Sequence, residues 1–222
     1  MADSPHAIRL PGETDDYRRA RNELLAAERE LRERMEAVAA KLRALPRGGR
    51  VPEDYVFDGP SGTVRLSSLF GSEKRSLVVY SFMYGPSMAS PCPMCTSFLD
   101  GLDRAAQHLT QRIGLAVVAR SPIERVAAFA ATRGWSRLPL LSSARNTYNV
   151  DYAAETPDGA QLPACNVFVR QPDGVFHFWS AELLYLPGPG HARHLDLLWP
   201  IWSFFDLTPE GRGDWMPKLA YG

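Results

Sequence analysis

The fold is organised around the segment Ser76-Leu-Val-Val-Tyr-Ser-Phe-Met-Tyr-Gly-Pro-Ser-Met-Ala-Ser-Pro-Cys-Pro-Met-Cys95. Its first eight residues are mostly apolar and predict a buried strand, and the Gly, Pro and Ser residues that follow predict a turn. The stretch ends in Cys92-x-x-Cys95. Apolar residues at helical spacing follow at once, namely Phe98, Leu99, Leu102, Ala105, Ala106 and Leu109. The two thiols are therefore expected at a strand-to-helix corner.

A thiol at the start of a helix has unusual chemistry. The first-turn amides have no partner within the helix and the helix dipole is positive there, so the thiolate is stabilised. This position predicts a reactive cysteine. The spacing lets Cys95 attack a mixed disulfide formed on Cys92, and such a pair in a βα unit of an intracellular protein favours redox chemistry.

Composition excludes several classes of protein. The 222 residues are 45% hydrophobic, which is enough for one substantial core. The 25 basic and 25 acidic residues balance, so nothing indicates a nucleic-acid surface. Three cysteines cannot form a disulfide framework, residues 1–30 are too polar for a signal peptide, and no apolar run reaches the ~20 residues of a membrane helix. We expect a cytoplasmic protein that binds neither nucleic acid nor a membrane.

Residues 14–45 predict one long amphipathic helix. The apolar residues Tyr17, Leu24, Leu31, Val38 and Leu45 recur at every seventh position, and Pro46-Arg-Gly-Gly49 ends the pattern. This apolar stripe can pack against the globular part of the same chain or against a second copy in a coiled coil. The second alternative predicts a homodimer.

From the strand before the dithiol onward, the predicted order is βαβα, a hairpin and a helix. Residues 114–119 are typical of a buried parallel strand, and Ser121-Pro122-x-Glu124 predicts a helix start with Ser121 as its N-cap. Residues 165–169 and 175–179 predict a β-hairpin, and residues 191–205 a helix interrupted at Pro200. The fold class is α/β, a central mixed sheet of order 4-3-1-2 flanked by helices. The expected domains are an N-terminal helical extension (1–50), the α/β domain (51–206) and a C-terminal tail (207–222).

The order of these elements resembles the thioredoxin superfamily, and some segments resemble its peroxiredoxin-like branch. These segments are Arg137-Leu-Pro-Leu-Leu-Ser-Ser143, Tyr148-Asn-Val150 and Phe168-Val-Arg-Gln-Pro-Asp-Gly174. The chain is also similar to a bacterial thioredoxin-like family catalogued as a domain of unknown function. That similarity rests on Asp54-Tyr-Val-Phe-Asp-Gly-Pro60, Ser81-Phe-Met-Tyr-Gly-Pro86, Cys92-Pro-x-Cys95, Gly134-Trp135, Val167-Phe-Val-Arg170 and Asp206-Leu-Thr-Pro-x-Gly-Arg212. The resemblance implies a thioredoxin-like fold and dithiol-disulfide activity, without an established substrate.

The sequence departs from the better-known relatives at two places. A peroxiredoxin's peroxidatic motif has Pro, then Thr or Ser four residues later, then Cys three residues after that. Pro86 and Ser90 fit its start, but Cys92 lies one residue before the position of the motif's cysteine and Cys95 two residues after it. This mismatch weakens the peroxidase hypothesis. The position of thioredoxin's cis-proline falls at Cys165, with Pro163 two residues earlier.

The site candidates follow from this placement. Cys92 is the expected attacking thiolate and Cys95 the resolving thiol. The residues expected to line a substrate cleft are Tyr84, Pro91, Pro93, Arg120, Trp135 and Cys165. Each has a structural alternative: a solvated loop arginine for Arg120, core packing for the aromatic residues and a small buried hydrophobe for Cys165.

Zinc binding is the alternative chemistry for the dithiol. One conceivable ligand set joins Cys92, Cys95 and Cys165 to a histidine such as His177, but a second Cys-x-x-Cys or a His-x-x-x-His is missing. We therefore expect no metal and no cofactor.

Thiol-disulfide oxidoreduction is the leading functional hypothesis. Its partners would be a protein or small-molecule disulfide and a thiol reductant. The first alternative is a thiol peroxidase in which Cys92 is peroxidatic and Cys95 resolves the sulfenic acid. The second is a non-enzymatic dimeric binding module whose dithiol is structural or zinc-bound.

Overall fold

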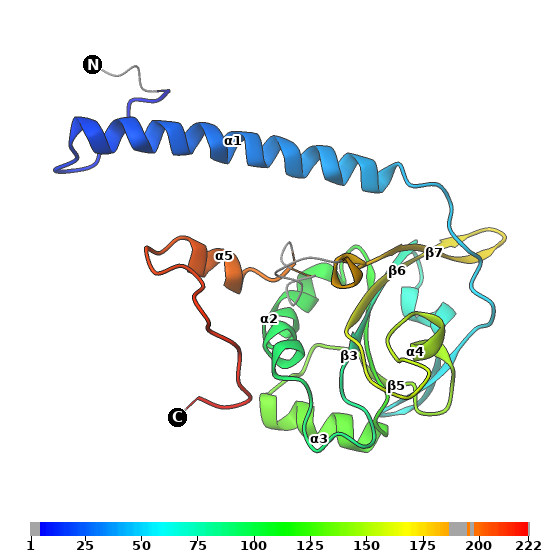
Figure 1. Ribbon diagram of the computed structural model, residues 1–222. Helices are drawn as coiled ribbons and strands as arrows, with labels where there is room; N and C mark the ends of the chain where they lie inside the picture. The colour runs from blue at the N-terminus through cyan, green and yellow to red at the C-terminus, as the bar shows by residue number, and fades with distance from the viewer. Residues whose placement is uncertain (1–4, 187–194, 196–197, 222) are drawn as a thin grey trace. The chain divides into compact units, whose positions relative to one another are not determined.

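The computed structural model describes residues 5–186, 195 and 198–221. The chain forms two compact units, Met1–Pro46 and Arg47–Gly222. The first holds helix α1 (Asp15–Arg43), and the second holds the sheet and the remaining helices (Figure 1). The domain boundaries expected at residues 50 and 206 remain a prediction.

Helix α1 confirms the long N-terminal helix. Thr14 caps it, because its side chain accepts a hydrogen bond from the amide of Tyr17 at 3.2 Å, and acidic residues occupy the first turn. Just before the helix, Glu13 accepts a 2.7 Å hydrogen bond from Nε of Arg18, and this bond lowers the pKa of Glu13 to about 2. The large apolar side chains of the stripe are exposed; they include Tyr17, Leu24, Leu31, Met35 and Val38.

One seven-stranded sheet organises the second unit. Its spatial order is β2 (Gly62–Arg65), β1 (Val56–Gly59), β5 (Leu140–Ser142), β4 (Gly114–Ala119), β3 (Ser76–Phe82), β6 (Ala164–Gln171) and β7 (Gly174–Ser180). The run β7-β6-β3-β4 is the predicted 4-3-1-2 order, with β3 parallel to β4 and antiparallel to β6. This confirms the thioredoxin-like fold. The strand β5 and the β1-β2 hairpin extend the sheet beyond that minimal arrangement.

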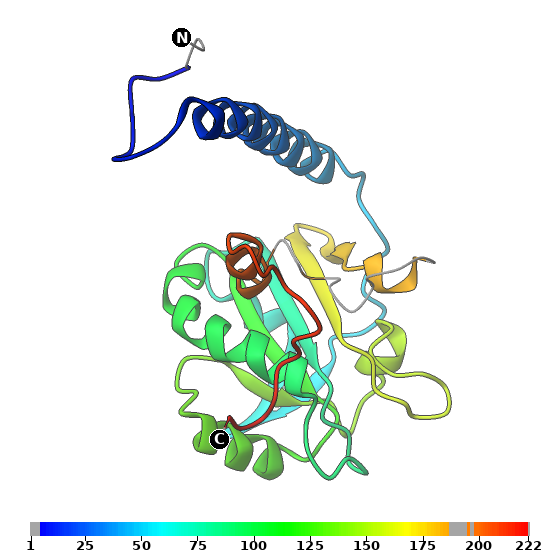
Figure 2. The same ribbon diagram turned by 60° about the vertical axis from the view of Figure 1, so that its left-hand side comes forward.

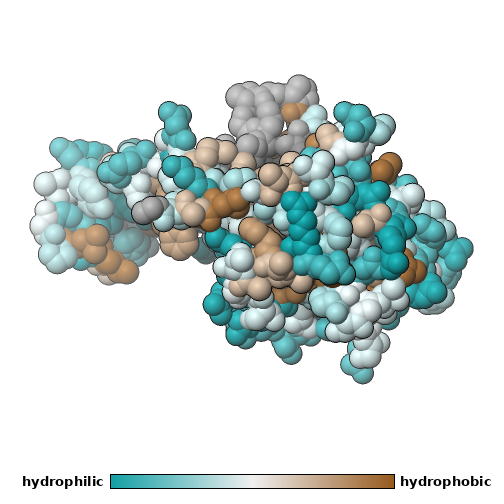
Figure 3. Space-filling model, turned by 90° about the horizontal axis from the view of Figure 1, so that it is seen from below, coloured by the Kyte–Doolittle hydropathy of each residue, from teal (hydrophilic) through white to brown (hydrophobic). Residues whose placement is uncertain are grey.

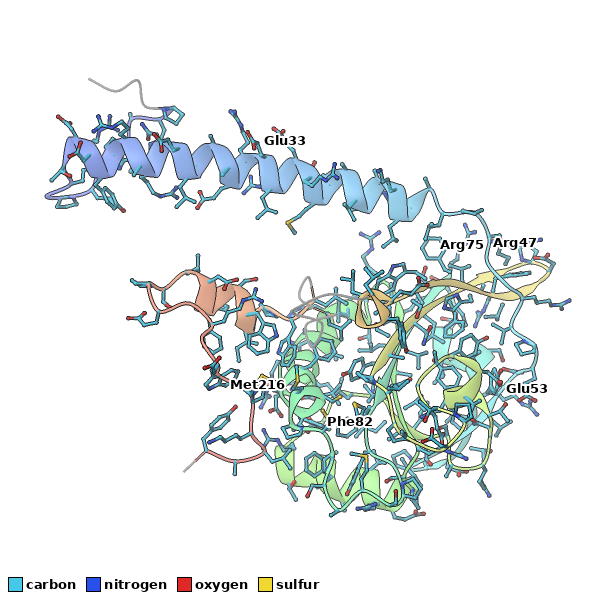
Figure 4. The ribbon with its side chains drawn as sticks, in the orientation of Figure 1. Glu33, Arg47, Glu53, Arg75, Phe82 and Met216 are labelled. Atoms are coloured by element: carbon cyan, nitrogen blue, oxygen red, sulfur yellow. The ribbon has the colours of Figure 1, made fainter. Side chains whose placement is uncertain are left out.

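Helices cover both faces of the sheet. Helices α2 (Pro93–Leu109) and α3 (Ile123–Arg133) lie on one face and the short α4 (Tyr148–Asp151) on the other (Figures 1 and 2). Between the sheet and α3, the ring of Phe82 lies 5.8 Å from that of Trp135 (Figure 4). On the α4 face, Tyr148 packs against Phe57 at 5.3 Å between ring centres. This unit also contains two 3₁₀ turns, Leu66–Phe70 and Leu183–Tyr185.

The C-terminal segment packs on the α2 face. The ring of Trp199 lies 6.1 Å from Phe98 of α2, and Nη1 of Arg133 on α3 donates a 2.8 Å hydrogen bond to the carbonyl of Leu219. Of the helix expected over residues 191–205, residues 191–194 and 196–197 lie outside the described residues. The described helix is α5 (Ile201–Asp206), which begins directly after Pro200.

The described surface is mixed in character. Apolar side chains are exposed on both units, and some appear in brown among hydrophilic neighbours in Figure 3. None of the described helices has the length and apolar character needed to cross a membrane.

Candidate functional site

The backbone places Cys92 at the start of α2. Strand β3 ends at Phe82, and the loop that follows is closed at its base because the amide of Cys92 donates a 3.0 Å hydrogen bond to the carbonyl of Met83. Pro93 then occupies the first helical position, where its fixed φ is compatible with a helix and its missing N–H has no cost. Cys92 is thus the N-cap residue, as the predicted strand-to-helix corner requires.

The same turn buries one thiol and leaves the other accessible. Cys92 is half-buried, whereas Cys95 is 3% exposed. Thr96 holds the turn in place, because its amide and its hydroxyl both donate to the carbonyl of Cys92, at 3.0 and 2.9 Å. Cys92, Cys95 and Cys165 are all free thiols. A reagent or substrate can therefore reach Cys92 first.

Hydrogen bonding to its sulfur makes Cys92 acidic. A hydrogen bond from the Cys95 thiol lowers the pKa of Cys92 to about 6, against the opposing effect of burial. The backbone amides of Cys95 and Met94 lower that pKa further, although the side chain makes no capping bond of ideal geometry. These amides belong to the unpaired first turn of α2, whose dipole also favours an anion. Cys92 is therefore largely a thiolate at neutral pH.

The environment of Cys95 has the opposite effect. Its hydrogen bond to Cys92, its burial and the charge on Cys92 raise the pKa of Cys95 well above that of an ordinary thiol. Two groups limit this rise: the hydroxyl of Tyr80 and the backbone of Met83 both form hydrogen bonds that favour the Cys95 thiolate. One nucleophile and one protonated thiol thus lie one turn apart.

Tyr80 is a site residue that sequence reasoning missed. It lies on β3, is 2% exposed, and packs with its ring centre 4.8 Å from that of Phe98. Burial, and then the neighbouring thiols, raise the pKa of Tyr80 well above its usual value. The hydroxyl therefore stays protonated and can donate a hydrogen bond. A strand pattern detects only that an aromatic residue faces the core, so the sequence carried no sign of a polar role.

Cys165 lies on the same face of the sheet as Tyr80. The two residues are direct partners in the β3-β6 register, and directly opposed side chains project to the same side. Cys165 is buried in one apolar cluster with Cys95 and Tyr80. Burial alone raises the pKa of Cys165 to about 12, which keeps it a neutral thiol. The described contacts support a wall of the site and not a third thiolate.

The other cleft candidates differ in position. Pro93 is exposed beside Cys92, and Pro91 is buried. Tyr84 and Trp135 both pack against Phe129 in an aromatic cluster, with the indole N–H of Trp135 donating to Asp100 at 2.8 Å. Their described contacts are therefore those of core residues, which corresponds to the structural alternative.

Arg120 has its own partners at the end of β4. Its Nη1 donates to the carbonyl of Ser143 at 2.6 Å, and its Nε lies 3.0 Å from a carboxylate oxygen of Glu155. The Arg120 side chain is 27% exposed, so it is neither fully solvated nor buried. These contacts hold the segments after β5 and α4 against the end of β4, and none of them involves the dithiol.

The expected N-cap of α3 is wrong. Ser121 does not cap α3, whose N-cap is Pro122. Its hydroxyl donates instead to the carbonyl of Gly85 at 3.0 Å, and its amide to the carbonyl of Tyr84 at 2.8 Å, so Ser121 holds the loop that leads to the dithiol.

The histidine of the alternative zinc set has other contacts. His177 pairs with Phe168 across β6 and β7, and its Nε2 lies 2.9 Å from Oδ1 of Asn166. Asn166 follows Cys165 on the same strand, so its side chain projects to the opposite face of the sheet. Among the residues that the structure describes, no three His, Cys, Asp or Glu side chains are arranged to hold a metal ion.

Solved structures with a similar chain path come from several bacteria. A peroxiredoxin-like protein from Aquifex aeolicus has 15% sequence identity over 61% of this chain and 75% of its own, with a TM-score of 0.44. Peroxidoxin BcpB from Mycobacterium tuberculosis has 22% identity over 71% and 98%, with a TM-score of 0.41. The exposed lipoprotein thioredoxin Etrx1 from Streptococcus pneumoniae has 16% identity over 66% and 98%, with a TM-score of 0.43. At these values the fold assignment rests on the strand order above.

Sequence comparison identifies the family. No curated protein matches the chain. Residues 9–220 match the family described as "Bacterial protein of unknown function (DUF899)". Because the match includes α1, the dithiol and the C-terminal segment, the chain belongs to this DUF899 family.

Proposed function

We propose that the protein is a thiol-disulfide oxidoreductase with Cys92 as the attacking thiolate and Cys95 as the resolving thiol. The observation that carries the proposal is the placement of the two thiols: Cys92 is half-buried at the N-cap of α2, and Cys95 is buried one helical turn later. This placement shifts their pKa values in opposite directions. An accessible thiolate is needed for the first attack, and a buried protonated thiol is needed nearby for the second. A purely structural pair of cysteines requires neither difference.

The proposed reaction has two exchange steps. The thiolate of Cys92 attacks one sulfur of a substrate disulfide, the substrate S–S bond breaks, and the departing thiolate takes up a proton. Cys95 then loses its proton and attacks the sulfur of Cys92, which releases the second substrate sulfur as a thiol. The substrate gains two electrons and two protons, and the protein holds a Cys92–Cys95 disulfide that a thiol reductant must reduce.

The hydrogen bonds of Cys95 suit the second step. In the mixed disulfide the Cys92 sulfur is neutral, so the charge that opposed ionisation of Cys95 is gone. The Tyr80 hydroxyl and the Met83 backbone still stabilise the Cys95 thiolate. Formation of the mixed disulfide therefore makes Cys95 easier to deprotonate, in the order that the reaction requires.

The segment that leads to Cys92 has no charged side chain of its own. Ser87, Ala89, Ser90 and Pro93 are exposed there, and the segment from Gly85 to Cys95 contains no charged residue. This neutral segment suits a disulfide in a protein or a small molecule without selecting its charge. The proposed partners are such a disulfide and a thiol reductant.

Two single substitutions test the roles of the thiols. Cys92→Ser is expected to abolish reduction of a model disulfide such as cystamine. Cys95→Ser is expected to stop after the first exchange and to accumulate a mixed disulfide on Cys92, because no second thiol can reach it. Intact-protein mass spectrometry measures the adduct.

The same experiment separates the alternatives. A Cys95→Ser variant that forms no adduct and behaves like the wild type contradicts the assigned roles. Consumption of hydrogen peroxide with a sulfenic acid on Cys92 indicates a thiol peroxidase instead. Zinc released by a chelator from the purified protein indicates the binding module.

A further inference from the structure

Arg125 binds the backbone of the loop that leads to the dithiol. It lies in the first turn of α3, and its Nη1 donates to the carbonyls of Gly85 and Pro86 at 3.3 and 3.0 Å. Its Nη2 donates to the carbonyls of Met88 and Ala89, the latter at 3.3 Å. One guanidinium thus satisfies four carbonyls of a single loop.

The ring of Tyr84 completes this arrangement. The guanidinium carbon of Arg125 lies 4.5 Å from the centre of that ring, a cation–π distance. Tyr84 is 5% exposed, so the loop is fixed at its start by packing and along its length by Arg125. The planar fork of arginine can serve several carbonyls at once, which a lysine ammonium on a flexible stem cannot reproduce.

The loop needs such a partner because it has no secondary structure of its own. Residues 83–92 join β3 to α2 without a ladder or helix to pair their backbone groups. Buried or partly buried carbonyls without a donor are unfavourable. The loop's internal bonds are few: the amide of Met88 donates to the carbonyl of Gly85 at 3.2 Å, and the base is closed between Met83 and Cys92. Without Arg125 the loop would keep these bonds and those from Ser121, but the carbonyls of Pro86, Met88 and Ala89 would lose their donor.

The loop in turn determines where Cys92 lies. The last carbonyl held by Arg125 belongs to Ala89, only three residues before Cys92. The reactivity of Cys92 depends on its placement against the free amides of the first turn of α2 and against the Cys95 thiol. We propose that Arg125 is a positioning residue for the dithiol, acting through residues 85–89 without touching either sulfur. This inference rests on the proposed function only in calling the dithiol an active site.

Arg170 provides a matched control. Its guanidinium carbon lies 4.7 Å from the centre of the Phe70 ring, and it donates to the carbonyls of Gly71, at 3.3 Å, and Ser67. It therefore has the same kind of ring and carbonyl contacts with a different loop. Arg170 follows Val169, which pairs with the first residue of β3, so it lies at the opposite end of that strand from the dithiol.

The test measures the acidity of Cys92 directly. The reduced wild type, Arg125→Lys and Arg170→Lys are alkylated with iodoacetamide between pH 4.5 and 9, and the modified residue is located by fragment mass spectrometry. Arg125→Lys is expected to shift the midpoint of Cys92 alkylation upward by about one pH unit, a roughly tenfold lower rate at pH 5. Arg170→Lys is expected to keep the wild-type midpoint. Circular dichroism establishes that each variant is folded.

The outcomes distinguish positioning from general stabilisation. Equal midpoints for Arg125→Lys and Arg170→Lys overturn the proposal. If Arg125→Lys does not fold, Ser121→Ala decides. It removes the 3.0 Å bond from Oγ of Ser121 to the Gly85 carbonyl and the 3.4 Å bond from Nη1 of Arg125 to that Oγ. The midpoint should shift in the same direction by a smaller amount, whereas no shift overturns the proposal. A wild type that reduces no disulfide but shows the Arg125 shift contradicts the proposed function and leaves this inference intact.

Discussion

Tyr80 links the strand before the dithiol to the thiol that completes the proposed reaction. Its hydroxyl favours the Cys95 thiolate, and its ring packs against Phe98 at 4.8 Å. Tyr80→Phe removes the hydroxyl and keeps the ring, so it isolates the hydrogen bond from the packing. Hydrogen bonds to charged groups contribute about 1.5–3 kcal/mol, which corresponds to a rate effect of about tenfold or more.

Tyr80→Phe is therefore expected to slow resolution of the mixed disulfide by at least about tenfold and to leave the first attack by Cys92 nearly unchanged. Single-turnover kinetics with a chromogenic disulfide separate the two steps. Tyr55→Phe is the control, because that hydroxyl donates to Asp151 at 2.7 Å and not to a thiol. Equal resolution rates in Tyr80→Phe and the wild type would remove Tyr80 from the mechanism.

At the residue scale, the sequence identifies residues whose chemistry is visible in their spacing. The spacing of Cys92 and Cys95 predicts their proposed roles in that way. Tyr80 and Arg125 do not, because their roles depend on which loop or thiol the folded chain brings against them. Cys165 is an intermediate case: topology predicts its strand neighbour, and only the register that pairs it with Tyr80 fixes its face.

At the scale of elements, Asp103 joins α2 to the segment that follows α3. It is 1% exposed, and its Oδ1 accepts hydrogen bonds from the amides of Ser136, Arg137 and Leu138 at 2.9, 2.8 and 3.2 Å. These bonds hold the turn before β5 against the helix that carries the dithiol.

Removing this carboxylate leaves three backbone donors without their partner. Asp103→Ala is expected to lower the free energy of unfolding by roughly 2–4 kcal/mol, since each orphaned buried group costs about 1–3 kcal/mol and partial hydration recovers some of it. Asp103→Asn keeps an acceptor oxygen and should lose distinctly less. Urea unfolding measures both, and equal losses for the two variants would show that the acceptor is not what matters.

The apolar stripe of α1 carries the prediction of self-association. Leu31 and Val38 are 61% and 47% exposed, and four heptads are long enough for a two-stranded coiled coil. Replacing both residues with Glu places charge in that seam and should shift a dimer to monomer in sedimentation velocity. Ala26→Glu with Ala40→Glu adds the same charge away from the stripe and should leave the dimer intact. A wild type that sediments as a monomer would dismiss the dimer.

Elements with strong periodicity were predictable, and elements defined by their neighbours were not. Helix α1 and strand β4 have continuous patterns of their own, so their bounds could be read closely. Strand β5 spans only Leu140–Ser142 and exists because β4 and β1 pair with it on either side. The Ser121 motif satisfied the sequence rule for a cap, but the nearby loop carbonyls offered its hydroxyl another partner.

At the scale of the whole molecule, the sheet order follows from a few general rules. Parallel strands joined by helices and a terminal hairpin leave little choice for β7-β6-β3-β4. The limits of the globular unit depend on pairing that no local pattern reveals: Arg50 forms a bridge with Phe176, and the amide of Val51 donates to Val175 at 2.9 Å. At the other end, Trp215 packs 4.9 Å from Phe205 between ring centres.

In the proposed mechanism, folding divides the two thiols into a nucleophile and a proton-bearing partner. The fully reduced wild-type protein is alkylated with iodoacetamide across pH 4.5 to 9, and the rate at Cys92 is followed by mass spectrometry. A lowered pKa keeps the thiolate populated above that pKa and removes it as the pH falls, so the rate is expected to fall through a midpoint at about pH 6, with Cys95 unreactive throughout. A midpoint near the ~8.5 of an ordinary cysteine, or equal reaction of both thiols, would contradict the account.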